Sequence, residues 1–283
     1  MKKLFIALII VITITSFSVA VYFGFRNKRG VPVEVEEAVK SFLDVPFIDR
    51  DIELSEGLDL SFWDTRSSQE IELLYQVMIL PRPKPRKNEV VLTVKTKAFH
   101  SKENIYFYIE WEDDTEDRFI DINKFSDAGA LMFPLNEEIR PSSLMMGFLG
   151  RANIWHWKAS RDSEFWLNET GFPKTYTDFY YPFEEEELFV VSRIQSNSAV
   201  SDLVAADVGT VTPKPVQNVE GRGVYENGVW KVVFRRALEA PDPEVDAGFN
   251  LKERVAAFAV WDGSKGDRGG RKSITDWVDL VIE

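Results

Sequence analysis

Residues 144–160 read LMMGFLGRANIWHWKAS and carry the most informative pattern in the chain. Trp155 and Trp157 flank His156, and an alternation with a period of two is typical of a β-strand that buries one face. Two adjacent methionines and a glycine precede this triplet. The stretch therefore predicts either a core strand with its loop, or one wall of a pocket for a flat cofactor.

Short patterns of the strand type recur along the rest of the chain. Four of them pair as two hairpins, one formed by residues 90–99 and 104–111 and one around Asn227-Gly228. A run of small polar residues over 192–215 reads instead as a long excursion. Many short strands separated by turns favour a mainly β chain, an antiparallel β-sandwich with long loops. The other expected strands cover residues 58–63, 70–80, 125–134, 253–261 and 274–282.

The first 29 residues form a separate segment. An apolar and hydroxyl run over residues 4–25 is long enough, as a hydrophobic helix, to cross the ~30 Å core of a bilayer. Ser18-Val19-Ala20 also offers a small-x-small site for signal peptidase, although the length of the run favours an uncleaved anchor. Both interpretations imply export to the periplasm or an equivalent compartment. We predict a signal or anchor segment over 1–29, a linker and lead-in over 30–57, and a sandwich domain over 58–283.

Charge and composition exclude several kinds of protein. A net charge of −12 opposes nucleic-acid binding, which needs a basic face. The chain has no cysteine, which excludes disulfides, cysteine-ligated zinc or Fe–S clusters, and covalently attached c-type haem. A metal or cofactor must therefore be held by histidine, methionine, lysine, tyrosine, carboxylates or the backbone.

Two loop motifs do not match known binding loops. The run over 266–273, GDRGGRKS, is not a P-loop, because Arg271 stands where a glycine must precede the lysine. The acidic run over 113–117 lacks the spaced ligands and central glycine of a calcium loop, so we expect a solvated loop. With His100 and His156 as the only histidines and no nucleophile elbow, hydrolytic catalysis has no support.

A non-covalent b-type haem remains compatible with the residues present. Its axial ligands would come from Met145 or Met146, a histidine, or a lysine. A thioether ligand favours the ferrous state and suits electron transfer. A lysine ligand must be neutral, so its pocket must be dry enough to lower its pKa. Core packing is the alternative for the methionine pair.

Five segments resemble one known family in the same chain order. The family is the haem b-binding gamma subunit of molybdenum enzymes of the dimethyl-sulfoxide-reductase superfamily. Its members accompany ethylbenzene dehydrogenase, dimethylsulfide dehydrogenase, selenate, chlorate and nitrate reductases, and nitrite oxidoreductases. The resemblance spans roughly residues 58–283. The segments are DAGALMFP (127–134), MMGFLGRANIWHWKA (145–159), DFYYPF (178–183), GRGVYENGVWKVVFRR (221–236) and FAVWDGSKGDRGGRKSITDW (258–277).

The resemblance implies a β-sandwich that holds one b haem between a methionine and a lysine. The family methionine matches Met146, which precedes Gly147, and Met145 is the alternative one residue away. The family lysine matches Lys272, and Lys265 in the same glycine-rich loop is the alternative. The glycines of this loop would let its backbone approach the haem closely.

The same resemblance implies the lining of the pocket. His156 would line the pocket rather than bind iron, although it stays an alternative ligand. The family commonly has a glutamine in its DAGALMFP-like segment, where this chain has Met132, so Met132 is a third candidate sulfur ligand. The implied lining residues are Gly147, Trp155, His156, Trp157, Gly269, Gly270 and Ser273.

The implied function is electron transfer without substrate chemistry. Partners would be an Fe–S beta subunit, a molybdenum catalytic alpha subunit, and a c-type cytochrome or a quinone system, with nitrate or nitrite ranked first as the substrate. The rival hypothesis is an exported carbohydrate-binding β-sandwich that binds glycans through exposed aromatic residues. Only the haem hypothesis uses the Met-Gly and glycine-rich lysine segments, because a sugar needs neither a soft ligand nor an unprotonated amine.

Overall fold

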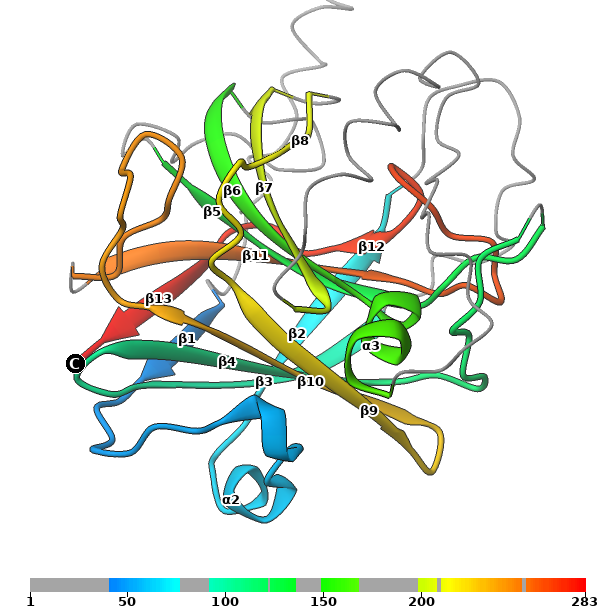
Figure 1. The fold of residues 1–283 in the computed structure, drawn as a ribbon, viewed down its shortest axis with the longest axis horizontal. Helices are drawn as coiled ribbons and strands as arrows, with labels where there is room; N and C mark the ends of the chain where they lie inside the picture. The colour runs from blue at the N-terminus through cyan, green and yellow to red at the C-terminus, as the bar shows by residue number, and fades with distance from the viewer. Residues whose placement is uncertain are drawn as a thin grey trace, which may run out of the picture. The chain divides into compact units, whose positions relative to one another are not determined.

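The computed structural model describes residues 41–76, 92–121, 123–135, 149–167, 198–207, 210–250 and 253–283 (Figure 1). Strands dominate these ranges, which confirms the expected mainly β fold. No helix within them has the length and apolar character that a membrane crossing requires. The hydrophobic helix expected over residues 4–25 lies outside the described ranges.

The described elements are short strands with brief helical turns between them. The helical elements are η1 (Leu54–Glu56), α2 (Leu60–Asp64) and α3 (Ala159–Trp166). The strands are β1 (Phe42–Val45), β2 (Gln69–Tyr75), β3 (Leu92–His100), β4 (Asn104–Glu112), β5 (Ala128–Pro134), β6 (Leu149–Lys158), β7 (Val200–Asp207), β8 (Thr212–Pro213), β9 (Glu220–Glu226), β10 (Val229–Ala237), β11 (Glu253–Trp261), β12 (Ser273–Ile274) and β13 (Val278–Ile282).

The strands form two layers with a shared core. One layer has the order β2-β3-β4-β10-β9, and the other has the order β8-β7-β6-β5-β11-β12 (Figure 1). Because β12 pairs with both β11 and β2, the hydrogen-bonded path continues from one layer into the other. Strand β1, within the expected lead-in over 30–57, pairs in parallel with β13. All other pairings between these strands are antiparallel, so the sandwich is an antiparallel sheet curled onto itself.

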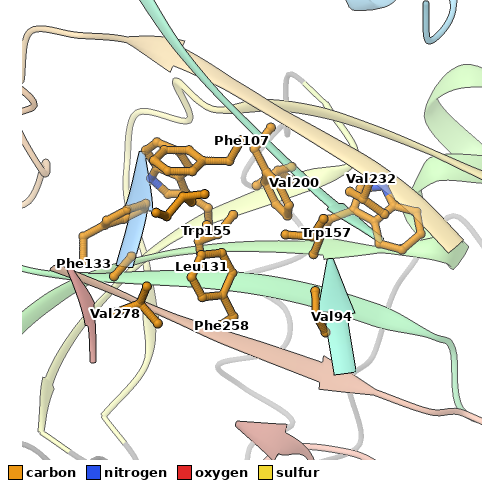
Figure 2. Close-up of a cluster of buried hydrophobic side chains, with 14 of the residues drawn as sticks. Val94, Phe107, Leu131, Phe133, Trp155, Trp157, Val200, Val232, Phe258 and Val278 are labelled. Atoms are coloured by element: carbon orange, nitrogen blue, oxygen red, sulfur yellow. The ribbon is translucent and has the colours of Figure 1, made fainter. Parts of the chain in front are cut away.

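Aromatic side chains fill the space between the two layers. Trp155 and Trp157 of β6 are fully buried there, among the residues shown in Figure 2. The ring centroid of Trp155 lies 5.9 Å from that of Phe107 on β4, and the centroid of Trp157 lies 5.1 Å from that of Trp230 on β10. Because each buried aromatic removes roughly 150–250 Å² from water, these contacts across the sandwich are a large share of its stabilisation.

Both predicted hairpins are confirmed. Strands β3 and β4 pair from Val94 opposite Trp111 to His100 opposite Ile105. Strands β9 and β10 pair around Asn227 (φ 53°) and Gly228 (φ 80°). Two consecutive positive φ angles define a type I′ turn, whose twist matches the twist of the flanking strands.

The strand predicted over residues 58–63 is wrong. This stretch forms the short helix α2, whose first turn is capped by Asp59: its side chain accepts a hydrogen bond of 3.1 Å from the backbone N–H of Phe62. Trp63 stacks on Tyr108 at 5.1 Å between centroids, on the side of β4 that faces away from the main core. A single capped turn is too short to show helical periodicity, so its two large aromatics resembled a strand.

Two other predictions need correction. The single strand expected over residues 274–282 is two strands, β12 and β13, which pair with different neighbours. The excursion expected over residues 192–215 contains β7 and β8. Strand β7 was missed because its core-facing side carries a polar residue, Asp202, which is buried and ion-paired with Lys214.

Candidate functional site

The face of β6 opposite the core carries His156. Because side chains alternate along a strand, the burial of Trp155 and Trp157 in the core directs His156 to the outer face of this layer. The ring of His156 lies 4.8 Å from that of Trp261, at the end of β11, with an interplanar angle of 37°. His156 and Trp261 therefore form an aromatic pair on the outer face.

Small side chains line the part of this face next to His156. His156 stands opposite Ala130 of β5, and Ala130 stands opposite Ala259 of β11. Two residues further along β5, on the same face, Met132 stands between Ile154 of β6 and Ala257 of β11. Alanines keep the sheet surface low, so a flat ligand could lie against it. A small apolar cluster on this face contains Ala152, Ala205, Ala257 and Ile274, with Met132, Ile154 and Trp277 packed against it.

Lys272 reaches the same aromatic pair from the end of the glycine-rich loop over residues 262–272. Its ammonium nitrogen Nζ lies 5.4 Å from the centroid of the Trp261 ring and donates a hydrogen bond of 3.4 Å to the carbonyl of Gly269. Burial lowers the pKa of the Lys272 ammonium to about 8. Desolvation acts here without the opposing effect of a nearby carboxylate, so this lysine is prepared to lose its proton.

Gly269 gives the loop the shape that this lysine needs. Its φ of 52° lies in the left-handed region, which a glycine adopts without a steric cost. Its carbonyl accepts a 2.9 Å hydrogen bond from the indole N–H of Trp261 as well as the bond from Lys272. Ser273 follows as a buried residue of β12, opposite Val260 and Tyr75. Gly270 completes the turn between Gly269 and the strand.

Lys265, the alternative lysine, has a different environment. It forms an ion pair with Asp262, and its side chain is 48% exposed. Although burial acts to raise the pKa of Asp262, hydrogen bonds from Lys265 and Ser264 outweigh it and hold that pKa below its usual value. A lysine that neutralises a carboxylate in this way is retained as an ammonium, which cannot bind a metal.

The structure does not bring Trp155 and Trp157 to this face. Both belong to the expected pocket lining beside His156, and their side chains point into the core instead of sharing the outer face with His156. The indole N–H of Trp155 donates to Asn153, and that of Trp157 donates to Asp162. The physical reason is the strand period itself, which places neighbours of His156 on the opposite side of the sheet.

The sulfur side of the expected site lies partly outside the described residues. Met145, Met146 and Gly147 belong to the segment over 136–148, which joins β5 to β6 and is not described. Met132 is described, and it is a half-buried thioether on the outer face. The candidate sulfur ligands therefore come from β5 or from its connection to the strand that carries His156.

Sequence reasoning missed Trp261 and Trp277 as members of this face. The indole nitrogen Nε1 of Trp277 is buried, and no described residue accepts a hydrogen bond from it. Buried donors are normally paired, so a ligand that offers an acceptor would suit this position. The alternation of alanines with Phe258 and Val260 in β11 was the available signal, because it separates a small outer side from a large inner side.

The prediction of a solvated acidic loop over residues 113–117 is wrong for its first member. Asp113 is only 4% exposed, because it follows β4 directly and is held at the end of the sandwich. Its backbone N–H donates to the carbonyl of Gly228, and its own carbonyl accepts a bond from the hydroxyl of Tyr225. The loop therefore begins inside the protein.

Sequence comparisons with known proteins find a matching family and several relatives. A sequence model of the family described as ethylbenzene dehydrogenase matches residues 60–273. A provisionally named respiratory nitrate reductase heme subunit from Haloferax mediterranei is 27% identical over 217 residues, which is 76% of this chain and 64% of that protein. The chlorate reductase subunit gamma of Ideonella dechloratans is 24% identical over 189 residues, 65% of this chain and 62% of that protein. The chain thus matches less than two thirds of the length of either relative.

Among solved structures, a family 9 carbohydrate binding module from Caldicellulosiruptor kristjanssonii in complex with glucose is similar in outline. It is 9% identical with a TM-score of 0.39, and the match covers 85% of this chain and 95% of that one. A likeness of this size carries no argument about what the present chain binds.

Proposed function

This chain belongs to the ethylbenzene dehydrogenase family, and from that premise we propose that it is an electron-transfer subunit that carries one non-covalent b-type haem. The outer face of β5, β6 and β11 would hold the haem. When bound, the haem supplies a one-electron ferric–ferrous couple. The chain's own residues provide the ligands, the dry surroundings and the shape of the pocket.

The environment of Lys272 is the observation that carries this proposal. Only a neutral amine has the lone pair that iron needs. At pH 7 an amine with a pKa of about 8 is neutral in roughly one molecule in ten, whereas an ordinary lysine with a pKa near 10.4 is neutral in about one in 2,500. The desolvated position of Lys272 therefore removes most of the cost of deprotonation, and we assign it as one axial ligand.

We assign Met146 as the second axial ligand, with Met145 and Met132 as the competing thioethers. The assignment of Met146 rests on its place before Gly147, which matches the family pattern. A soft thioether ligand would raise the reduction potential of the haem, which suits a carrier of electrons. Gly269 and Gly270 would let the lysine loop approach the haem plane.

His156, Trp261 and Trp277 would line the haem rather than bind its iron. The His156 and Trp261 rings already contact each other, and Lys272 lies over Trp261, so the three groups are mutually positioned before any ligand enters. The buried Nε1 of Trp277 could donate to a polar edge of the cofactor. A preformed set of this kind restricts the reorganisation that accompanies electron transfer.

The names of the relatives support a wider assembly. A nitrate reductase heme subunit and a chlorate reductase gamma subunit are both parts of oxidoreductase complexes by their names. We propose that this chain passes electrons between the Fe–S subunit of an exported molybdenum oxidoreductase, of the nitrate or nitrite type, and a cytochrome or quinone system. The segment over residues 1–29 would direct export and anchor the chain in the membrane. The chain itself would not act on the substrate.

The rival hypothesis of a glycan-binding module requires exposed aromatic side chains. All eight tryptophans lie in the described ranges, and none of them is exposed: five are buried and three are half-buried. Flat indole platforms for sugar rings are therefore missing from the described surface. The exposed aromatic side chains of the described surface are the phenylalanines Phe42, Phe47, Phe119 and Phe165. The position of the tryptophans favours the haem hypothesis.

Visible spectra of the full chain, purified in detergent and reconstituted with haem, test the proposal. We expect a b-type spectrum after reduction with dithionite. Lys272→Ala and Met146→Ala should each change the ligand-sensitive bands, whereas Lys265→Ala, Met145→Ala and Met132→Ala should leave them unchanged. Far-UV circular dichroism of each variant confirms that it is folded.

Three outcomes would contradict parts of the proposal. A folded wild-type chain that stays colourless after reconstitution overturns haem binding. A silent Lys272→Ala with a changed Lys265→Ala moves the lysine ligand to the earlier loop position. Loss of the low-spin spectrum in His156→Ala, with Met146→Ala silent, replaces the methionine by a histidine ligand.

A further inference from the structure

Three buried aspartates meet where strands of both layers end. Asp113 follows β4, Asp127 precedes β5, and Asp262 follows β11. One carboxylate oxygen of each lies within 4.8 Å of one oxygen of each of the others. The three residues are 4%, 0% and 9% exposed. Three carboxylates are thus collected in a volume from which water is largely excluded.

Two of these carboxylates accept several hydrogen bonds. Asp127 accepts bonds from the backbone N–H groups of Gly263 and Asp117, at 2.8 and 2.7 Å, and from the indole N–H of Trp230 at 3.0 Å. Asp262 accepts from the hydroxyl of Ser264 and the backbone N–H of Lys265, and it is ion-paired with the ammonium of Lys265.

Asp113 differs from the other two. Its Oδ1 atom accepts a bond of 3.2 Å from the backbone N–H of Thr115. Its Oδ2 atom is buried, and none of the described residues donates a hydrogen bond to it. A buried carboxylate oxygen without a donor is costly, because it has lost its water and gained nothing in exchange. The cluster therefore has an open coordination position on a carboxylate that faces the other two.

The negative charge of the cluster is also not balanced by nearby cations among the described residues. Three ionised carboxylates and one ammonium, Lys265, leave a net charge of −2. Like charges at this separation in a dry site repel strongly. A divalent cation would balance this charge and supply the missing partner of Asp113.

We propose that Asp113, Asp127 and Asp262 bind a hard divalent cation of the calcium type. Calcium takes oxygen ligands at about 2.3–2.6 Å, so two oxygens on one ion lie at most about 4.6–5.2 Å apart, which accommodates the observed separations. The ion would join the end of β4 in one layer to β5 and β11 in the other. It would also fix the start of the loop that ends at Lys272.

The backbone next to Asp262 packs closely against residues 117–125. A Cβ atom on Gly263 would lie 1.9 Å from the carbonyl oxygen of Phe125 and 2.9 Å from the Cβ of Asp117. Only glycine therefore lets the loop pack against residues 117–125 and place Asp262 beside the other two carboxylates. The proposed cation site does not depend on bound haem, so the haem-free chain is used to test it.

The test uses the full chain in detergent, stripped with EDTA and exchanged into chelator-free buffer, with CaCl₂ as the probe. Isothermal titration calorimetry should show one saturable binding event per chain, and calcium should raise the melting temperature. Asp113→Asn should lower the affinity at least tenfold. Asp114→Asn is the matched control, because it removes the same charge from the exposed neighbouring residue and should leave the affinity unchanged.

Terbium provides a second measurement that reports the location of the ion. Because the indole of Trp230 is hydrogen-bonded to Asp127, excitation of tryptophan should sensitise terbium emission, and excess calcium should remove it. Asp113→Asn keeps the side-chain shape and removes a buried charge, so the metal-free variant should melt no lower than the wild type.

Absence of both a heat of binding and a melting shift at millimolar calcium would overturn the proposal. Equal calcium affinities in Asp113→Asn and the wild type would also overturn it. Should Asp113→Asn fail to fold, the wild-type terbium titration decides: a saturable sensitised signal that calcium displaces supports the site, and its absence rejects it.

Discussion

The ammonium of Lys272 lies 5.4 Å from the centroid of the Trp261 ring, and both groups donate to the carbonyl of Gly269. This relationship links the end of β11, the glycine-rich loop and the proposed ligand of the iron. The carbonyl positions both side chains, while the half-buried surroundings lower the pKa of the lysine to about 8. Desolvation of this ammonium costs stability in the haem-free chain.

Replacing Lys272 by methionine should therefore separate stability from function. Lys272→Met removes a desolvated ammonium and keeps an unbranched side chain, so the haem-free variant should be more stable than the wild type by about 1–2 kcal/mol at pH 7. The same variant should lose the ligand-sensitive bands of the reconstituted haem. Urea denaturation and visible spectra are the measurements.

Lys265→Met is the matched control for that experiment. It removes the partner of the buried Asp262 carboxylate, so it should lower the stability of the haem-free chain and keep the haem spectrum. A stabilised Lys265→Met together with a destabilised Lys272→Met would reverse our assignment of the two lysines.

Gly269→Ala should disturb the same loop through the backbone. Its φ of 52° costs a residue with a Cβ about 1–2 kcal/mol, and the shifted carbonyl would release both Trp261 and Lys272. We expect a lower melting temperature and weaker haem retention. For the melting temperature, Gly270→Ala is the control, because Gly270 is not among the described glycines with positive φ. Equal effects of the two substitutions would contradict the role assigned to the Gly269 turn.

Much of the fold was predictable from local patterns, and the exceptions have physical causes. The strand over residues 253–261 and the turn at Asn227-Gly228 depend on local composition and φ preferences, and both predictions are confirmed. The helix α2 and the break between β12 and β13 depend on which neighbours each short segment meets. That information is in the rest of the chain, so no local pattern could supply it.

In the candidate site, too, some features follow from local sequence motifs and others depend on the folded topology. The family motif predicts Lys272 as a ligand, and the structure supplies a reason in its desolvation. The side of the strand on which Trp155 and Trp157 lie depends on the register of β6 between β5 and β7. The Asp113, Asp127 and Asp262 cluster joins residues up to 149 positions apart, and only the folded topology brings them within 4.8 Å.

Gly223→Ala should destabilise the sandwich core. A Cβ at this position of β9 would lie 2.2 Å from the Cζ2 atom of Trp157, so the backbone rests directly on the indole. Displacing a buried tryptophan from a packed core should cost about 1–3 kcal/mol. Gly248→Ala is the control, because its Cβ would meet its nearest neighbour, Ala240, at an ordinary 3.6 Å. Chemical denaturation of both variants measures the difference, and similar midpoints would refute this account of the packing.

Stability of the metal-free chain should fall as the pH rises from about 4 to about 7.5. The folded-state pKa values of Asp113 and Asp127, about 6 and about 7, lie above the unfolded value near 3.9. In that window the folded chain binds more protons than the unfolded chain, so each rise in pH favours unfolding. Burial also raises the pKa values of Asp162 and Asp202, which adds to the same slope.

We expect a total loss of roughly 2–4 kcal/mol over this window, measured by urea denaturation in EDTA. Calcium should reduce the loss, because it holds the carboxylates ionised in the folded chain. A stability that stays constant or increases between these pH values in EDTA would show that the aspartates are solvated or paired in a way the structure does not have.

Adjacent residues of β6 should respond to substitution in opposite ways, because they lie on opposite faces. Trp155 is fully buried between the layers, where its ring contacts Phe133 at 4.6 Å and Phe249 at 5.7 Å between centroids. Trp155→Ala should cost about 3–5 kcal/mol of unfolding free energy. His156→Ala removes a ring that contacts Trp261 on the outer face, so it should cost about 1 kcal/mol and alter the haem environment. Denaturation midpoints and the spectrum of each folded variant give the comparison, and a His156→Ala variant as unstable as Trp155→Ala would place the imidazole in the core instead.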